Sequence, residues 1–287
     1  MVSAAQSLFA ACESYVTSRQ CPDAGFCFYR AWGVEESNPA DTCAAIASLR
    51  LLSADIPRRD AVVRWLRATQ LADGRFPSPT VAWYALDALR HLDEVLRADP
   101  RPYLHECVAR LVPWLDADLS PSAALLELAR LVESCLGEGA ALASSARDIA
   151  ASNVRSLRSG NGGYGRPQPN LIDTDCAVAV LFMLDLPAAD GPLREFLSRC
   201  EDPEQGFRLV PDGSGGSLAS TRAGLRLCTH LGAQVPARAA AGSRRFALAC
   251  RTSNGGFGRS PGAIPTLDDT RFALEILLDQ NLATQRR

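Results

Sequence analysis

The chain repeats one pattern six times, and this repetition limits its fold more than any other feature of the sequence. A glycine and an aromatic residue are followed by a loop, a polar pair and an apolar run rich in small residues. The segments read GFCFYRAWGVEESNPADTCAAIASLRLL, GRFPSPTVAWYALDALRHL, SPSAALLELARLV (without the glycine and the aromatic residue), GGYGRPQPNLIDTDCAVAVLFML, GFRLVPDGSGGSLASTRAGLRLC and GGFGRSPGAIPTLDDTRFALEILL. Because one such unit cannot bury its apolar face alone, the repeats must stack on their neighbours.

The spacing of the repeats predicts two helices in each. Intervals of 40, 40, 54, 45 and 49 residues separate the positions taken as equivalent, which are Thr42, Ala82, Ser122, Cys176, Thr221 and Thr270. The helix before each glycine, as in RRDAVVRWLRATQ, has one apolar stripe, whereas the helix after each polar pair, as in DCAVAVLFML, is apolar almost all round. Strand signals are weak. We therefore predict an all-α fold with an inner and an outer layer of helices, in a single domain over residues 1–287.

Two further features are assigned to packing. The glycine pairs 162–163 and 255–256 are interpreted as left-handed C-caps of helices, and the aromatic residues at 26, 76, 164, 207 and 257 as contacts between repeats. The periodicity alone does not decide between an open solenoid and a closed ring.

Composition narrows the function. A formal net charge of -2 provides no basic surface for nucleic acid or an anionic membrane. No segment is long and apolar enough for a membrane span, and no leader is recognised, so we expect a cytoplasmic protein. The ten cysteines are scattered without a CxxC pair and are expected as buried thiols. All 30 basic residues are arginine, which excludes a Schiff-base lysine and a Walker lysine.

The repeats resemble those of the prenyltransferase and squalene-cyclase superfamily. The glycine-aromatic turn, the loop and the Asp-Thr or Ser-Thr start of the following helix match in the first, fourth, fifth and sixth repeats. The resemblance implies an α/α toroid, in which six inner helices surround an apolar cavity. The superfamily includes β subunits of protein prenyltransferases, terpene cyclases and non-catalytic members.

One sub-family is the squalene-hopene type, or class II, terpene cyclases, which protonate an alkene with the central Asp of an Asp-x-Asp-Asp-Thr-Ala motif. PTLDDTRFAL resembles this motif with Asp268 and Asp269 in register, although Thr266 replaces the first Asp. DTDCAVAVL resembles it in Asp173 and Asp175. Two adjacent carboxylates cannot both ionise cheaply, so either pair would hold a proton that can be given to an alkene.

The carbocation formed in this way needs a dry cavity and aromatic faces. Candidates to contact the substrate are Trp83, Tyr84, Phe182 and Phe272 on inner helices, with Tyr29 and Trp32 in the first loop. No cofactor is expected. Cyclases of this type pair two barrels, and this chain has residues for one, so a homodimer or a second subunit would supply the other wall.

The second sub-family is the prenyltransferase β subunits, whose Gly-Arg-x-x-Lys-Leu-Val-Asp-Gly-Cys-Tyr stretch holds a diphosphate and zinc. The fourth repeat resembles it in Gly165, Arg166, Leu171, Asp173 and Cys176. It has Asn170 in place of the lysine, and Asp269 falls where the zinc histidine would stand. Because zinc prefers Cys and His, no metal is expected.

Structural roles compete with these functions. Asp41, Asp175, Ser220 and Asp269 stand where inner helices begin, so helix N-capping accounts for them, and capping would lower the pKa of a carboxylate. Arg166 and Arg259 follow glycine-aromatic turns and are either solvated or contact an anion. Three functions stay open: a terpene cyclase-like enzyme acting on an isoprenoid, which we favour, a prenyl diphosphate-binding β subunit, and a lipid-binding scaffold.

Overall fold

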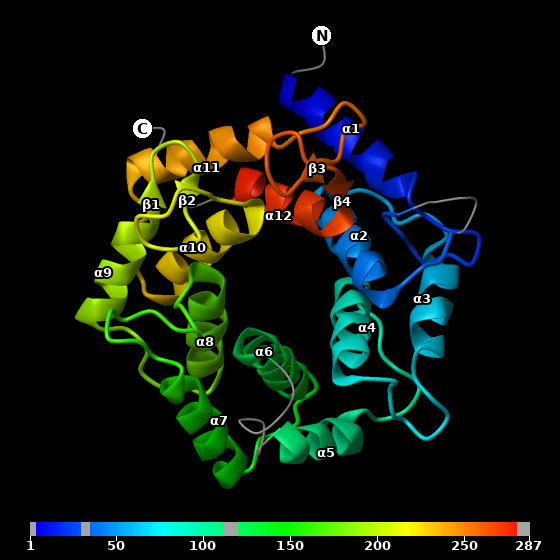
Figure 1. The fold of residues 1–287 in the computed structure, drawn as a ribbon. Coiled ribbons are helices and arrows are strands. Elements are labelled where there is room, and N and C mark those ends of the chain that lie inside the picture. The colour runs from blue at the N-terminus through cyan, green and yellow to red at the C-terminus, as the bar shows by residue number, and fades with distance from the viewer. Residues whose placement is uncertain (1–3, 30–34, 112–119, 280–287) are drawn as a thin grey trace.

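A computed structural model describes residues 4–29, 35–111 and 120–279 of the chain. These residues form two concentric layers of helices (Figure 1). The inner helices are α2 (Pro39–Leu51), α4 (Pro79–His91), α6 (Pro121–Gly137), α8 (Leu171–Met183), α10 (Leu218–His230) and α12 (Leu267–Leu278). The outer helices are α1 (Ala4–Thr17), α3 (Arg59–Ala68), α5 (Arg101–Leu111), α7 (Ser144–Ser156), α9 (Gly191–Cys200) and α11 (Ala237–Ala249).

The inner helices form a closed ring. Each packs on the next, and α12 packs on α2. Arg271, the fifth residue of α12, lies 3.8 Å from the sulfur of Cys43, the fifth residue of α2. Side chains at equivalent positions of these neighbouring helices are thus in contact. The inner helices are therefore parallel, and the fold is the predicted all-α toroid.

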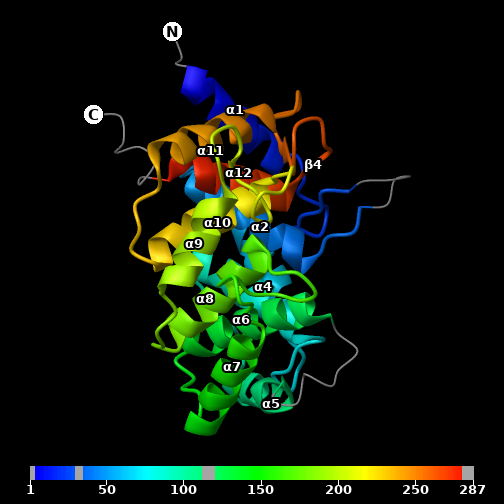
Figure 2. The same ribbon diagram turned by 60° about the vertical axis from the view of Figure 1, so that its left-hand side comes forward.

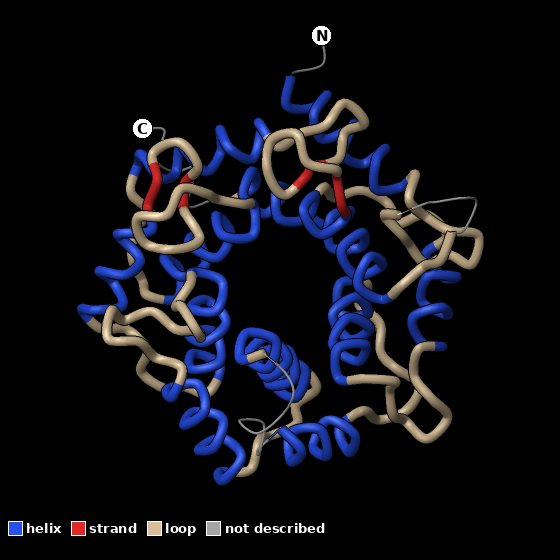
Figure 3. Tube along the Cα trace, viewed as in Figure 1, coloured by secondary structure: helices blue, strands red, loops and turns tan. Residues whose placement is uncertain are grey.

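The little sheet that the described residues contain lies in the loops (Figure 3). Strands β1 (Glu201–Asp202) and β2 (Gly206–Phe207) pair antiparallel, as do β3 (Phe257–Gly258) and β4 (Pro265–Thr266). Each pair is two residues long and connects an outer helix to the next inner one.

The hydrophobic core lies between the two layers of helices. Leu125 and Val180 of inner helices and Val154 and Phe196 of outer helices belong to one buried cluster. Figure 2 shows the layers from another side, with α11 stacked against α12. All ten cysteines lie among the described residues as free thiols, and nine of them are buried.

The inner helices begin with polar caps, but these are not the residues assigned from the sequence. The side chains of Asn38, Asn170, Ser217 and Thr266 accept a hydrogen bond from the backbone N–H three residues later. Asp41, Ser220 and Asp269 are the third residues of their helices, and Asp175 is the fifth residue of α8. The N-cap assignment of these four residues was wrong, because the preceding Asn, Ser or Thr already fills the capping position.

The fourth residue of three inner helices connects the helix to the glycine-aromatic turn that precedes it. Thr42, Thr174 and Thr270 accept hydrogen bonds from the backbone N–H groups of Phe26, Tyr164 and Phe257, at 2.9, 3.0 and 3.0 Å. The equivalent of Thr42 in the fourth repeat is therefore Thr174 and not Cys176. In the third repeat the N-cap Ser120 makes the equivalent Ala124 and not Ser122. The aromatic residues at 26, 76, 164, 207 and 257 are all buried, as expected for packing.

The glycine pairs are not helix C-caps. Helix α7 ends at Ser156 and α11 at Ala249, several residues before Gly162 and Gly255. Both glycines have a positive φ, 89° and 92°, inside turns. A Cβ atom at Gly255 would lie 2.3 Å from the carbonyl oxygen of Ala11, so this turn also needs glycine to let the last repeat approach α1.

Candidate functional site

A cavity of about 480 Å³ lies inside the ring of inner helices. Its wall comes from α4, α6, α8, α10 and α12, and on α8 and α10 it includes the second, fifth, sixth and ninth residues of the helix. These positions form one face of an α-helix. On α8 they are Ile172, Asp175, Cys176 and Ala179, and on α10 they are Ala219, Arg222, Ala223 and Arg226.

The wall of this cavity is charged, contrary to the expectation of an apolar pocket. Four arginines and four carboxyl-bearing residues line it among the described residues: Arg130, Arg222, Arg226, Arg271, Asp87, Glu133, Asp175 and Asp268. The inner helices are thus not apolar all round. The outward faces pack against the outer layer, while the inward face carries the charges.

Asp268, the second residue of α12, points into this cavity. Its carboxyl group forms no hydrogen bond with any residue of the described part of the chain. Burial raises its pKa above the ordinary value, and the charges of Asp41 and Asp269 raise it further, against the influence of Arg271 and Arg130. This carboxyl group is thereby biased towards its protonated form.

Asp41 influences the pKa of Asp268 because closure of the ring brings α2 against α12. It lies on α2, which packs against α12, and is itself buried. Its Oδ2 accepts hydrogen bonds from the Asn38 side chain at 2.7 Å and from the backbone N–H of Phe28 at 3.1 Å. In the sequence Asp268 has only Asp269 as a neighbouring carboxylate, because the first and last repeats are adjacent only once the ring closes.

Asp175 also lines the cavity and is 5% exposed. Its Oδ2 lies 3.5 Å from Nε of Arg226, and its Oδ1 is buried without a hydrogen-bond partner. Burial raises the pKa of Asp175, while Arg226 and Arg222 oppose this shift. An unsatisfied buried oxygen of this kind is uncommon in folded proteins.

Asp173 and Asp269 are engaged in other contacts and are not part of the cavity wall. The Oδ2 atom of Asp173 accepts hydrogen bonds from Ser122 at 2.5 Å and from the Asn170 side chain at 2.7 Å. Asp269 accepts a hydrogen bond from the Thr266 hydroxyl at 2.8 Å. Asp173 and Asp175, two residues apart on one helix, face different directions and form no contact with each other. Burial raises the pKa of Asp269, so the lowering expected from a capping position does not occur.

Three of the four proposed substrate-contacting aromatics hold an arginine against the ring. The guanidinium of Arg130 lies 4.8 Å from the ring centroid of Trp83 and 4.7 Å from that of Tyr84. Arg222 lies 4.9 Å from the ring of Phe272. The rings of the cavity therefore already stabilise positive charge.

Phe182 differs from the other three aromatics. It stacks at 5.1 Å on His230 at the carboxyl-terminal end of the ring, and it is 60% exposed. Burial and the nearby Arg226 lower the pKa of His230, which favours the neutral form of its imidazole. Of the aromatics expected in the first loop, Tyr29 is exposed and does not line the cavity, and Trp32 lies outside the described residues.

A chain of ion pairs connects three inner helices. Glu275 of α12 pairs with Arg222 of α10 and, at 2.9 Å, with Arg271 of its own helix. Arg271 continues to Asp87 of α4 at 3.4 Å. Burial opposes ionisation of Glu275, but the two arginines outweigh it and hold its pKa below the ordinary value. Glu275 is therefore held in its charged form between the two arginines.

Sequence reasoning missed Arg130, Arg222, Arg226, Arg271 and Asp87. The sequence signal that could have found them is the position of a residue along its helix. Arg222, Arg271 and Asp175 each occupy the fifth residue of an inner helix, which shares a face with the second, sixth and ninth residues. Because the fourth repeat was aligned at Cys176 instead of Thr174, this equivalence was not visible in the sequence.

The two loop arginines singled out from the sequence do not line the cavity. Arg166 donates to the carbonyl oxygens of Leu157 at 2.9 Å and Ser156 at 2.8 Å. It therefore caps the carboxyl end of α7. Arg259 is exposed, and its charge lowers the pKa of Asp269.

The described residues contain no group of three or more His, Cys, Asp and Glu side chains arranged to hold a metal ion. Cys176, the thiol considered for zinc, lines the cavity, and burial raises its pKa to about 12.

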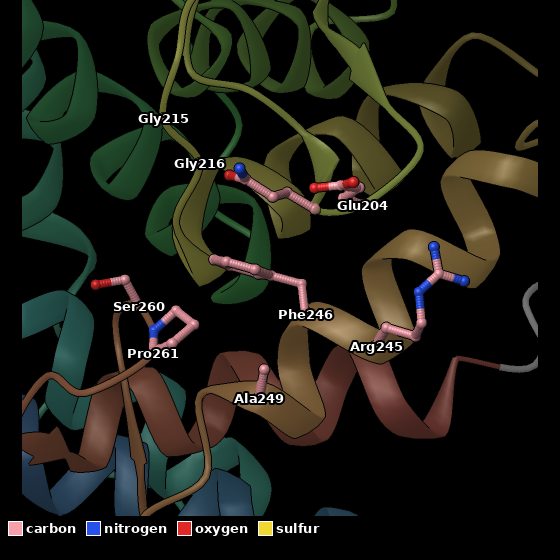
Figure 4. A pocket seen from close by; sticks show the side chains of 9 residues that line it. Glu204, Gly215, Gly216, Arg245, Phe246, Ala249, Ser260 and Pro261 are labelled. Carbon is pink, nitrogen blue, oxygen red and sulfur yellow. The ribbon is translucent and has the colours of Figure 1, made fainter.

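A second hollow of about 460 Å³ lies outside the ring (Figure 4). The side chain of Phe246 on α11 lies between Gly216 on one loop and Ser260 and Pro261 on another. This second hollow contains none of the candidate residues considered above.

The comparisons with known proteins agree with this architecture. The sequence model of the prenyltransferase alpha-alpha toroid domain matches residues 3–82 and 79–277. No curated protein matches the chain. Of the helices described, none is both long and apolar enough to cross a bilayer.

Proposed function

Since the chain belongs to the prenyltransferase alpha-alpha toroid domain family, we propose that it is a terpene cyclase-like enzyme that cyclises or isomerises an isoprenoid inside the ring. In this proposal the reaction starts by protonation of an alkene, and Asp268 gives the proton. The observation that carries the proposal is the state of Asp268, a carboxyl group on the cavity wall whose pKa is raised and which forms no hydrogen bond to another described residue. The resemblance of PTLDDT to the cyclase motif supports the same residue.

The proposed step balances without a cofactor. The π electrons of the alkene form a C–H bond with the Asp268 proton, and the O–H electron pair stays on the carboxylate. The cation formed on the neighbouring carbon is either attacked by a second alkene, which closes a ring and moves the positive charge to another carbon, or reacts without ring closure. In both cases a neighbouring C–H bond then breaks, its electrons form a new double bond, and the proton returns to the Asp268 carboxylate directly or through water. Arg271 and Arg130, whose charges favour the ionised form of Asp268, stabilise the carboxylate that remains.

The aromatic residues of the wall support the cationic intermediate in this proposal. Phe182 is 60% exposed and, unlike the other three aromatics, holds no arginine against its ring among the described residues, so its π face can contact a carbocation. Trp83, Tyr84 and Phe272 also line the cavity. The mouth of the cavity would be covered by a second copy of the chain or a different subunit.

A second candidate is a β subunit-like protein that binds a prenyl diphosphate. The observation in its favour is Arg130, which lines the cavity and forms no ion pair with any carboxylate among the described residues. Its guanidinium donates to the Tyr84 hydroxyl at 2.7 Å. An arginine without a carboxylate partner is suited to a phosphate.

The test is turnover in deuterium oxide. Prenyl alcohols, hydrocarbons and diphosphates of several chain lengths are incubated with the protein, and products are analysed by mass spectrometry. An acid-initiated reaction places one deuterium on the carbon that was protonated.

Asp268→Asn should lower the rate at least about 100-fold. Asp93→Asn, which changes an exposed carboxylate, is the matched control. An unchanged rate in Asp268→Asn, or conversion of no isoprenoid, contradicts the proposal. Binding without conversion would favour the scaffold function.

A further inference from the structure

The cavity inside the ring limits the size of a ligand through its volume. This volume is about 480 Å³. Each non-hydrogen atom of a ligand packed in such a space takes roughly 25–30 Å³, as a benzene ring in a protein cavity or a water molecule in the liquid does. A cavity of about 480 Å³ therefore has room for about 16 to 19 non-hydrogen atoms.

The residues at its two ends give a second measure, the length of the cavity. Ile172 and Ala219 are the second residues of α8 and α10, and Met183 and His230 are the thirteenth. Because a helix rises about 1.5 Å per residue, the cavity extends about 16 Å along these two helices. An extended isoprenoid advances about 5 Å per isoprene unit, since each unit adds four zigzag carbon–carbon bonds of about 1.5 Å. Three units, or fifteen carbons, therefore span the cavity.

The two measures select the same chain length independently. A fifteen-carbon chain with a one-atom head group has about 16 non-hydrogen atoms and fits the volume. A twenty-carbon chain with the same head group needs roughly 530–630 Å³ and about 20 Å of length. Folding shortens a chain but does not reduce the space that its atoms need. Chains of four or more isoprene units thus exceed the cavity in both volume and length.

The charges of the wall limit the head group. Arg222 and Arg271 flank Glu275, and Arg226 faces Asp175 at 3.5 Å. The fourth arginine of the wall donates to a tyrosine hydroxyl. A diphosphate would compete with these carboxylates for the guanidiniums, and the carboxylates would repel its charges. It would also add about nine non-hydrogen atoms, or roughly 250 Å³. An uncharged head group avoids both costs.

We propose that the substrate is an uncharged isoprenoid of three isoprene units, which lies along the axis of the ring with one end at Asp268. This inference rests on the proposed function, and it deepens it. Asp268 is the second residue of α12, so it lies at the same end of the cavity as Ile172 and Ala219. A chain that spans the cavity presents its terminal alkene to Asp268, and not an alkene from its middle. The length of the cavity thus selects both the substrate and the double bond that is protonated.

The test is a binding series of prenyl alcohols with two, three and four isoprene units. It is made on Asp268→Asn, which should convert none of them, and is followed by the fluorescence of the tryptophans, one of which, Trp83, lines the cavity. From two units to three, the affinity should rise at least about 100-fold, because five more carbons are buried. From three units to four it should not rise, because the fourth unit finds no room.

Diphosphates of two and three units complete the series. Each should bind more weakly than the three-unit alcohol. A further rise in affinity with the fourth unit, tighter binding of either diphosphate, or no binding of any ligand overturns the inference.

Two variants that narrow the cavity locate the binding site. Ala129→Leu and Ala219→Leu each enlarge a small, half-buried residue of the wall and take up roughly 80 Å³, the space of about three ligand atoms. Either should weaken binding of the three-unit alcohol at least about tenfold, and that of the two-unit alcohol much less. Ala241→Leu, at an exposed position of α11, is the matched control and should change neither. Equal effects on both alcohols, or none, in a folded variant overturn the inference. If neither variant folds, the chain-length series still decides.

The same series on the unaltered protein separates the two proposals. A limit at three units, without any product, leaves the inference on chain length intact and defeats the proposed reaction. Turnover of an isoprenoid with four or more units, which Asp268→Asn abolishes, keeps the reaction and overturns the limit.

Discussion

Arg271 of the last inner helix lies 3.4 Å from Asp87 of the second inner helix, 184 residues earlier in the chain. The same guanidinium lies 3.8 Å from the sulfur of Cys43, which in turn donates to Asp87 at 3.2 Å. Three helices, α12, α2 and α4, therefore meet at one buried group. This contact joins the two ends of the repeat array.

Replacing Arg271 by Leu should destabilise the protein by about 3–5 kcal/mol, because the buried Asp87 and the half-buried Glu275 would lose this partner. Urea unfolding followed by circular dichroism measures the loss. If the chain is one cooperative domain, the transition should stay single. The control is Arg50→Ala, whose pair with Asp93 is exposed, and it should cost less than about 1 kcal/mol. Similar losses in the two variants would show that the closing contact contributes little.

Asp41→Asn should move the pH dependence of turnover to lower pH. Asp268 must be protonated to react, so the rate falls as pH rises through its pKa. The negative charge of Asp41 helps to raise that pKa, and removing it makes ionisation of Asp268 easier. The fall in rate should therefore begin at a lower pH than in the unaltered protein. The profile of kcat/KM between pH 4 and pH 8 provides the measurement, with Asp93→Asn as the control. A midpoint that stays in place or rises would exclude Asp41 from the site.

Thr174→Val should cost about 1–3 kcal/mol of stability, since the buried N–H of Tyr164 would lose its acceptor. The volume of the side chain hardly changes, so packing is kept. Thr17→Val, at a hydroxyl that donates to the carbonyl oxygen of Glu13 near the surface, is the matched control. Thermal unfolding compares the two, and equal melting temperatures would argue against the role given to the threonine.

The protein should bind far less than one zinc ion per chain, and its activity should survive chelation. The described residues lack a cluster of three His, Cys, Asp or Glu side chains that could hold the ion around Cys176. Metal analysis of protein purified without a metal-binding tag checks this. One zinc per chain that disappears in Cys176→Ser would favour the transferase function.

The sequence by itself determined the helical layers and the number of repeats. Local signals suffice for these features, because an amphipathic stripe, a polar start and a glycine turn act within one helix or one turn. The place of Trp83, Tyr84, Phe182, Phe272, Asp175 and Asp268 on the inner face also follows from helix periodicity. The exact caps were misassigned by three to five residues, since Asn38 and Asn170 compete with nearby aspartates for the same position.

Only the tertiary structure decided which carboxylates share the cavity. Asp173 and Asp175 are neighbours in the sequence, yet a separation of two residues on a helix turns them to different faces. Asp41 and Asp268 are 227 residues apart, yet closure of the ring makes one raise the pKa of the other. The same closure pairs Arg271 of the last inner helix with Asp87 of α4. Burial and pairing depend on all six repeats together, and so no single segment of the sequence contains them.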